Sequence, residues 1–190
     1  MKNTFLLFLA SAAFFISSCG YRPGYGTFLD RYSSLSVPYV IGDLDGALTA
    51  ELVRAVASSL TFDHSSTEGE LLLIVKLLDV EDENIGFRYE KVQGKKYKRS
   101  IIPVETRLTA TAEITVVNAA TGCSLIPPAR VTAFYDFDHE YNATEHDSNT
   151  FSLGQLSDAD AAFAAARVPL NRILVQKIIE YIYGISYTQD

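Results

Sequence analysis

The sequence predicts an α/β fold, an α+β two-layer sandwich in which two helices lie on one face of a four-stranded mixed sheet. Two observations predict it. Between residues 35 and 183, strand and helix patterns follow one another in the order strand, helix, three strands, helix. Apolar residues keep to one side of both helices and of the clearest strands. One-sided elements must cover one another's apolar faces, and placing the helices on the sheet does so.

The order begins with a short strand at residues 35–40, where Pro38 leaves one side without a ladder donor. A helix over about residues 46–60 follows, and Asp45 is its predicted N-cap. If the first two strands run parallel, the helical connection between them is right-handed. The predicted apolar stripe of this helix consists of Leu48, Leu52, Ala55, Val56, Ser59 and Leu60.

Three strands come next in the chain. Residues 61–69 are a polar loop, and residues 70–80 form a central strand whose pattern allows two further residues. Residues 105–117 alternate most regularly, residues 130–138 form the last strand, and residues 139–156 are a polar loop. The side chains predicted to face the helices are Leu108, Ala110, Ala112, Ile114, Val116, Val131, Ala133, Tyr135 and Phe137. The opposite face of the sheet is then polar and rich in threonine, with Thr109, Thr111, Glu113 and Thr115.

A second helix over residues 157–183 completes the predicted domain. Ser157 or Asp158 caps its start, Pro169 kinks or splits it, and Gly184 is the predicted C′ residue. Its predicted apolar stripe consists of Leu170, Ile173, Leu174, Ile178, Tyr181 and Ile182.

The first residues of the chain have the pattern of an export signal. The apolar run at residues 5–16 is shorter than the roughly 20 residues that span a bilayer. It therefore predicts a secretory signal rather than a membrane span. The run ends in Ile16-Ser17-Ser18-Cys19, which resembles a bacterial lipobox, in which the cysteine receives lipid and becomes the mature N-terminus. The alternative is a plain signal peptide with a chance cysteine.

The domain organisation follows from that cysteine. We expect residues 1–18 to be a lipoprotein signal peptide, residues 19–34 a lipidated tether, and residues 35–190 a single α/β domain. The net charge of −7 becomes about −8 after residue 18, because the signal carries one lysine and no acid. An acidic chain lacks the basic face of a generic nucleic-acid binder. With Cys19 acylated, only the thiol of Cys123 remains, so no intrachain disulfide forms.

The sequence contains no catalytic constellation, no metal site and no cofactor motif. His64, His139 and His146 stand in polar sequence and are interpreted as solvated loop residues rather than metal ligands. The acidic run at residues 81–83 is interpreted as a solvated strand end. Cys123 has no adjacent basic residue or histidine that would activate its thiol. We therefore expect a protein that is not an enzyme.

One cationic segment stands out in this acidic chain. It lies between two predicted strands, so we expect it at the tip of a long hairpin over residues 81–104, with tyrosines interleaved. Such a tip can bind phosphates through its charges; the alternative is a loop that only improves solubility. The residues of this cationic tip are Arg88, Lys91, Lys95, Lys96, Lys98 and Arg99.

The layout of the mature chain resembles that of the lipopolysaccharide-assembly lipoproteins, the LptE-like family. The resemblance rests on Cys19-Gly20-Tyr21, on Ser36-Val37-Pro38-Tyr39, on the leucine-rich segment 48–56, and on the segments Glu70-Leu71-Leu72-Leu73-Ile74-Val75 and Arg107-Leu108-Thr109-Ala110-Thr111-Ala112. The closing helix also matches in position and amphipathicity. No single motif is stringent, and the long hairpin and the loop at residues 139–156 depart from the pattern.

The resemblance implies a lipoprotein subunit of the lipopolysaccharide translocon, anchored to the outer membrane on its periplasmic side. It would plug a β-barrel partner, help to assemble it and bind lipopolysaccharide, with acyl chains such as palmitate on Cys19. In such lipoproteins, an Asp directly after the lipidated cysteine tends to mark retention in the inner membrane. This chain has Gly20 at that position, which implies the outer-membrane destination. The alternative function is that of an accessory or scaffold lipoprotein of envelope or secretion assembly, without lipopolysaccharide binding.

Overall fold

The computed structural model describes residues 31–59, 62–91, 99–139 and 159–185 of the chain. They form a mixed five-stranded sheet with two helices, which confirms the predicted α/β class and adds one strand to the predicted four. The strands are β1 (Ser34–Ser36), β2 (Asp63–His64), β3 (Leu71–Lys91), β4 (Arg99–Asn118) and β5 (Ala129–Asp138), and the helices are α2 (Ala47–Ser58) and α3 (Ala159–Ile185). The order in the sheet is β2-β1-β3-β4-β5, with β1 parallel to both neighbours and β3, β4 and β5 antiparallel.

The additional strand, β2, lies in the segment predicted as a polar loop. Ser34 and Leu35 of β1 pair with Asp63 and His64 of β2. Two residues are too few to show any periodicity, so only the partner strand reveals this element. The first strand also ends earlier than predicted, at Ser36, which leaves Pro38 beyond the ladder.

Two predicted helix ends are wrong. Gly46, in a left-handed conformation with φ 74°, is the N-cap of α2, in place of Asp45. The Asp45 carboxylate instead accepts a hydrogen bond from the Ala47 N–H at 3.1 Å, and that of Asp43 accepts from the Thr49 N–H at 2.7 Å. Acids ahead of the helix thus satisfy first-turn donors without occupying the cap position.

The second wrong end is that of α3, which runs to Ile185. Gly184 therefore lies inside the helix and is not its C′ residue. The helix also continues through Pro169 without splitting. Ala166 and Leu170, on either side of the proline, are both buried in the core, and this packing holds the two halves in one element. The predicted caps Ser157 and Asp158 lie outside the described residues.

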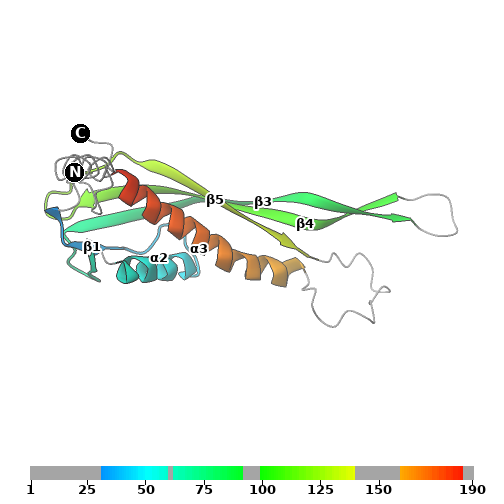
Figure 1. Ribbon diagram of the computed structural model, residues 1–190, viewed down its shortest axis with the longest axis horizontal. Helices are drawn as coiled ribbons and strands as arrows, with labels where there is room; N and C mark the ends of the chain where they lie inside the picture. The colour runs from blue at the N-terminus through cyan, green and yellow to red at the C-terminus, as the bar shows by residue number, and fades with distance from the viewer. Residues whose placement is uncertain (1–30, 60–61, 92–98, 140–158, 186–190) are drawn as a thin grey trace, which may run out of the picture.

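Both helices lie on the same face of the sheet (Figure 1), as predicted. The predicted stripes supply the core: Leu48, Leu52 and Val56 from α2 pack in one cluster with residues of α3 and of the inner sheet face. Every second residue of β4 from Leu108 to Val116 is buried, which confirms the predicted inner face. The buried residues of α3 in this cluster are Ala166, Leu170, Leu174, Val175, Ile178 and Ile182.

The hairpin of β3 and β4 is much longer than the rest of the sheet (Figure 1). β5 pairs with β4 only as far as Asp138 opposite Glu105, whereas β3 and β4 remain paired to Lys91 opposite Arg99. The two strands beyond β5, residues 86–91 and 99–104, are called the ribbon below. The central strand was predicted over residues 70–80 with an extension through residue 82, whereas β3 continues to Lys91.

Candidate ligand-binding surfaces

The ribbon carries those cationic residues of the predicted tip that the structure describes. Arg88 is exposed on β3, and the backbones of Lys91 and Arg99 form the last described pair of the ladder. Antiparallel pairing thus brings together residues that are eight positions apart in the sequence, at the distal end of the ribbon. Lys95, Lys96 and Lys98 lie outside the described residues, as does the predicted lipidation site Cys19.

Apolar side chains lie on the ribbon close to this cationic end. Phe87 is 50% exposed and lies opposite Pro103, and Ile101 is 60% exposed. Residues 101 and 103 of one strand point to the same side, as does Phe87, which lies opposite Pro103. One side of the ribbon therefore offers apolar surface next to its charged end, an arrangement suited to a ligand with apolar and anionic parts.

The sheet face opposite the helices is polar, as predicted. The Thr111 hydroxyl lies 3.0 Å from that of Thr132 on β5. Arg107 donates two hydrogen bonds of 2.7 Å to the Asp136 carboxylate, and its guanidinium lies 4.5 Å from the centre of the Phe134 ring. These bonds lower the pKa of the Asp136 carboxyl and raise that of the Arg107 guanidinium.

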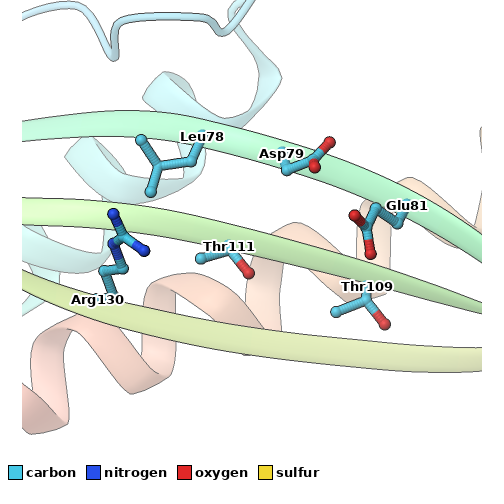
Figure 2. A pocket seen from close by; sticks show the side chains of 6 residues that line it. All are labelled: Leu78, Asp79, Glu81, Thr109, Thr111 and Arg130. Carbon is cyan, nitrogen blue, oxygen red and sulfur yellow. The ribbon is translucent and has the colours of Figure 1, made fainter.

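A hollow of about 310 Å³ opens on this polar face (Figure 2). Its walls come from three strands. Leu78, Asp79 and Glu81 lie along β3, Thr109 and Thr111 on β4, and the side chain of Arg130 reaches from β5 across β4. Arg130 also lies 4.0 Å from Glu113 in a largely exposed ion pair.

A β-bulge at Leu78 decides which β3 side chains reach this face. Leu77 pairs with Ala112 and Asp79 pairs with Thr111, so Leu78 is an extra residue without a partner. Opposite residues in an antiparallel ladder share a face, so Asp79 and Glu81 lie on the face of Thr111 and Thr109. The interpretation of residues 81–83 as a strand end is therefore wrong: they lie inside β3, and the bulge determines which of them share that face.

His139 is not the solvated loop residue that was predicted. It is 6% exposed, and its Nε2 lies 2.8 Å from the Thr106 hydroxyl, which donates to Asn84 Oδ1 at 2.9 Å. Since that hydroxyl has one proton, Nε2 is the nitrogen that donates to Thr106. Within the described part of the chain, Nδ1 has no hydrogen-bond partner. His139 continues the inward positions of β5 after Phe137, a signal that extending the alternation by one step could have found.

The other residues considered for chemistry remain apart. His64 is half-buried in β2, and Cys123 is an exposed free thiol in the turn after β4; His146 lies outside the described residues. No group of three potential metal ligands among His, Cys, Asp and Glu occurs in the described part of the chain. None of the helices seen in the described ranges is long and apolar enough to cross a membrane.

Comparison with known proteins gives a likeness in fold. No family model and no curated protein matches the sequence. Among solved structures, a candidate lipoprotein from Caulobacter crescentus superposes with a TM-score of 0.51 at 12% identity, covering 85% of this chain and 97% of its own. Rare lipoprotein B from Shewanella oneidensis gives 0.46 at 13% identity, with 82% and 96% covered. A minor lipoprotein from Acinetobacter baumannii gives 0.46 at 12%, with 82% and 95% covered. The chain therefore shares its fold with the Caulobacter protein; at this identity, the likeness establishes the fold alone.

Proposed function

We propose that this chain is a lipoprotein subunit of the lipopolysaccharide translocon, anchored at the periplasmic side of the outer membrane. In this proposal it plugs and helps to assemble a β-barrel partner and binds lipopolysaccharide, and it has no catalytic role. Residues 1–18 are the signal peptide, residues 19–34 the lipidated tether and residues 35–190 the folded domain. The family resemblance in the sequence suggests this function, and the ribbon is the observation that carries it.

The ribbon supports the proposal because it extends past β5 with a cationic end. Lys91 and Arg99 are paired there, and the seven residues between them contain Lys95, Lys96 and Lys98. A chain with a net charge of −7 thus concentrates positive charge at one extremity. Paired lysines and arginines bind phosphates well, and the exposed Phe87 and Ile101 offer adjacent contacts for acyl chains. Lipid A combines both chemistries.

The polar sheet face supports the proposed barrel partner. The lumen of a large outer-membrane barrel is polar and lies beside polar side chains of a plug. The face with Thr109, Thr111 and the Arg107–Asp136 pair has this character, and the two described helices, α2 and α3, lie on the other face (Figure 1). An elongated shape also suits a plug that must lie along a barrel.

The first test replaces the cationic tip. Each lost charge-assisted contact with phosphate should weaken binding by about 1.5–3 kcal/mol. Added salt should reduce the effect, because exposed charges are screened over about 8–10 Å at 0.10–0.15 M salt. The tip variant carries four changes to Ala, at Lys95, Lys96, Lys98 and Arg99. It should lose lipopolysaccharide binding and still co-purify with the barrel from detergent-solubilised outer membrane.

A matched control removes the same number of positive charges from the exposed surface of the body, which is the described part of the chain other than the ribbon. Unchanged lipopolysaccharide affinity of the tip variant at low salt would show that the tip is only a solubilising loop. Failure of any barrel to co-purify with the wild type would favour an accessory lipoprotein of envelope assembly. The control changes, each to Ala, are at Arg54, Lys76, Arg167 and Arg172.

A separate test concerns the anchor. Since Ile16-Ser17-Ser18-Cys19 resembles a lipobox, Cys19→Ser should release the protein to the soluble fraction or leave an uncleaved precursor. Intact mass of the wild type should show di- or triacylation of Cys19 and absence of residues 1–18. Cys123→Ser is the control and should leave the mass of the anchor unchanged. An unmodified Cys19 in the wild-type protein would contradict the assignment.

A further inference from the structure

We propose that the hollow on the polar sheet face is a saccharide-binding site. The inference rests on the proposed function and deepens it by naming a second part of the ligand. The cationic ribbon end would take the phosphates, whereas the hollow would take neutral sugar residues. Leu78, Asp79, Glu81, Thr109, Thr111 and Arg130 form its walls.

The hydrogen-bonding groups of the hollow lie in two rows on neighbouring strands. Asp79 lies opposite Thr111 and Glu81 lies opposite Thr109, so carboxylates line one strand and hydroxyls line the next (Figure 2). Carboxylates only accept hydrogen bonds, the guanidinium of Arg130 only donates, and threonine hydroxyls do both. A sugar offers several hydroxyls that donate and accept at close spacing, and its C–H groups can pack on Leu78.

The acidic side chains of the hollow are not engaged by other described side chains. Within the described residues, neither Asp79 nor Glu81 forms an ion pair or a side-chain hydrogen bond, although Arg107 and Arg130 on neighbouring strands do. The bulge at Leu78 brings both carboxylates to this face. Bulges commonly redirect side chains next to functional sites. The volume of about 310 Å³ also matches the lower end of small-ligand pockets, roughly 300–1,000 Å³.

Two other ligand classes fit this hollow less well. An anion would meet two carboxylates and only one guanidinium, which already lies 4.0 Å from Glu113. A metal ion needs converging ligands, and no group of three potential ligands exists in the described ranges. Asp79 and Glu81 lie two residues apart on one strand, so their Cα atoms are about 6.8 Å apart at a rise of about 3.4 Å per residue. A ligand with distributed hydroxyls matches that spacing.

The experiment is an NMR titration of the mature chain with core oligosaccharide that has been freed of acyl chains and dephosphorylated. This probe cannot bind through phosphate contacts at the tip. We expect saturable shifts of the amides of residues 78–81 and 109–111 that change little with added salt. Asp79→Asn combined with Glu81→Gln should weaken the binding at least tenfold. Glu83→Gln, on the same strand and outside the hollow, is the matched control and should leave the affinity unchanged.

The outcomes separate this inference from the proposed function. Absence of shifts at these residues, or an equal loss in Glu83→Gln, would overturn the saccharide site even if lipopolysaccharide and the barrel still bind. Shifts at the hollow caused by calcium chloride but not by the oligosaccharide would also overturn it, in favour of a cation site. Saturable oligosaccharide binding without a barrel partner would support the site while contradicting the translocon function.

Discussion

At the scale of single residues, some carboxylates at the surface of the sheet are held by local partners. Arg107 is held between the Asp136 carboxylate and the Phe134 ring, and both ends of the ion pair are about one-third exposed. Glu70 has a comparable role at the start of β3, where its carboxylate accepts from the Ser33 N–H at 2.6 Å. Such bonds lower the pKa of both carboxyls. Because exposed ion pairs contribute little to folding, the Arg107–Asp136 pair adds little to the stability of the sheet.

The Asp136 pair predicts a dependence on pH with a definite sign. A carboxyl whose pKa is lower in the folded state stabilises the fold above its unfolded pKa and loses that contribution as the pH falls through its folded pKa. The wild type should therefore exceed Asp136→Asn slightly in urea midpoint at pH 7. The difference should shrink as the pH falls below about 3.9, where unfolded Asp titrates, and should vanish below the lowered pKa of folded Asp136.

Asp138→Asn, on the same strand, serves as the control for removing a carboxylate. Urea unfolding of all three proteins between pH 7 and pH 2.5, at low and at high salt, measures the effect. A gap between the wild type and Asp136→Asn that widens as the pH falls would contradict the assigned sign.

At the scale of elements, amphipathic helices and one bulge organise the domain. The apolar stripes of α2 and α3 meet each other and the inner sheet face, so each helix is stable only against its neighbours. The bulge at Leu78, by contrast, places the carboxylates of Asp79 and Glu81 on the sheet face that points away from the helices. The same hairpin therefore has an apolar face toward the helices and a polar face on the uncovered side.

The helix stripes predict where a charge is not tolerated. Leu52 and Leu174 are fully buried, so Leu52→Asp or Leu174→Asp places an unpaired carboxylate in the core. Each change should cost several kcal/mol, against a total stability of about 5–15 kcal/mol for a typical domain. Thermal or urea unfolding should show loss of the cooperative transition. Ala57→Asp and Ala164→Asp, at exposed positions of the same helices, are controls that should melt near the wild type. Similar melting of buried and exposed variants would contradict the layer assignment.

At the scale of the whole molecule, the body and the ribbon have different requirements for stability. The body has a core between two layers, whereas the ribbon extends from it as two strands (Figure 1). Isolated two-stranded hairpins are marginal in water, and open strand edges attract other strands. On the body, Lys177 blocks part of the β5 edge by donating to the Thr132 carbonyl at 2.8 Å. The ribbon is thus the part that gains most from a partner.

This division predicts that the body folds without the end of the ribbon. Replacing residues 89–101 by Asn-Gly keeps the Arg88–Ile102 pair and closes the strands with a two-residue turn. The melting temperature should change by only a few degrees, because the core cluster of the described residues lies in the rest of the sheet and in the two helices. Lipopolysaccharide binding should be lost.

The control for the shortened chain replaces Phe87 and Ile101 by Thr in the full-length protein. If the proposed function is right, this variant should keep binding through phosphate and lose only the contribution of acyl chains. A shortened chain that fails to fold would show that the ribbon belongs to the folding unit.

The sequence alone determined the faces of the long elements. The alternation in residues 105–117 assigned the side chains of β4 from Leu108 to Val116 to the correct layer, and the stripe containing Leu170 and Leu174 was assigned in the same way. These patterns are local, because which side a residue points to depends only on its place in the helical or strand repeat. The fold class followed from the order of such elements, and the cationic segment was visible as a run of residue types.

Only the tertiary structure decided what depends on a neighbouring strand. β2 exists because β1 pairs with it, the bulge at Leu78 is defined by the ladder with β4, and His139 is buried where Thr106 meets it. The hollow needs side chains from three strands in one register, which no local pattern encodes. Pairing energy comes from partners distant in the sequence, so the faces of the strands could be predicted from local periodicity, whereas their lengths, edges and shared surfaces could not.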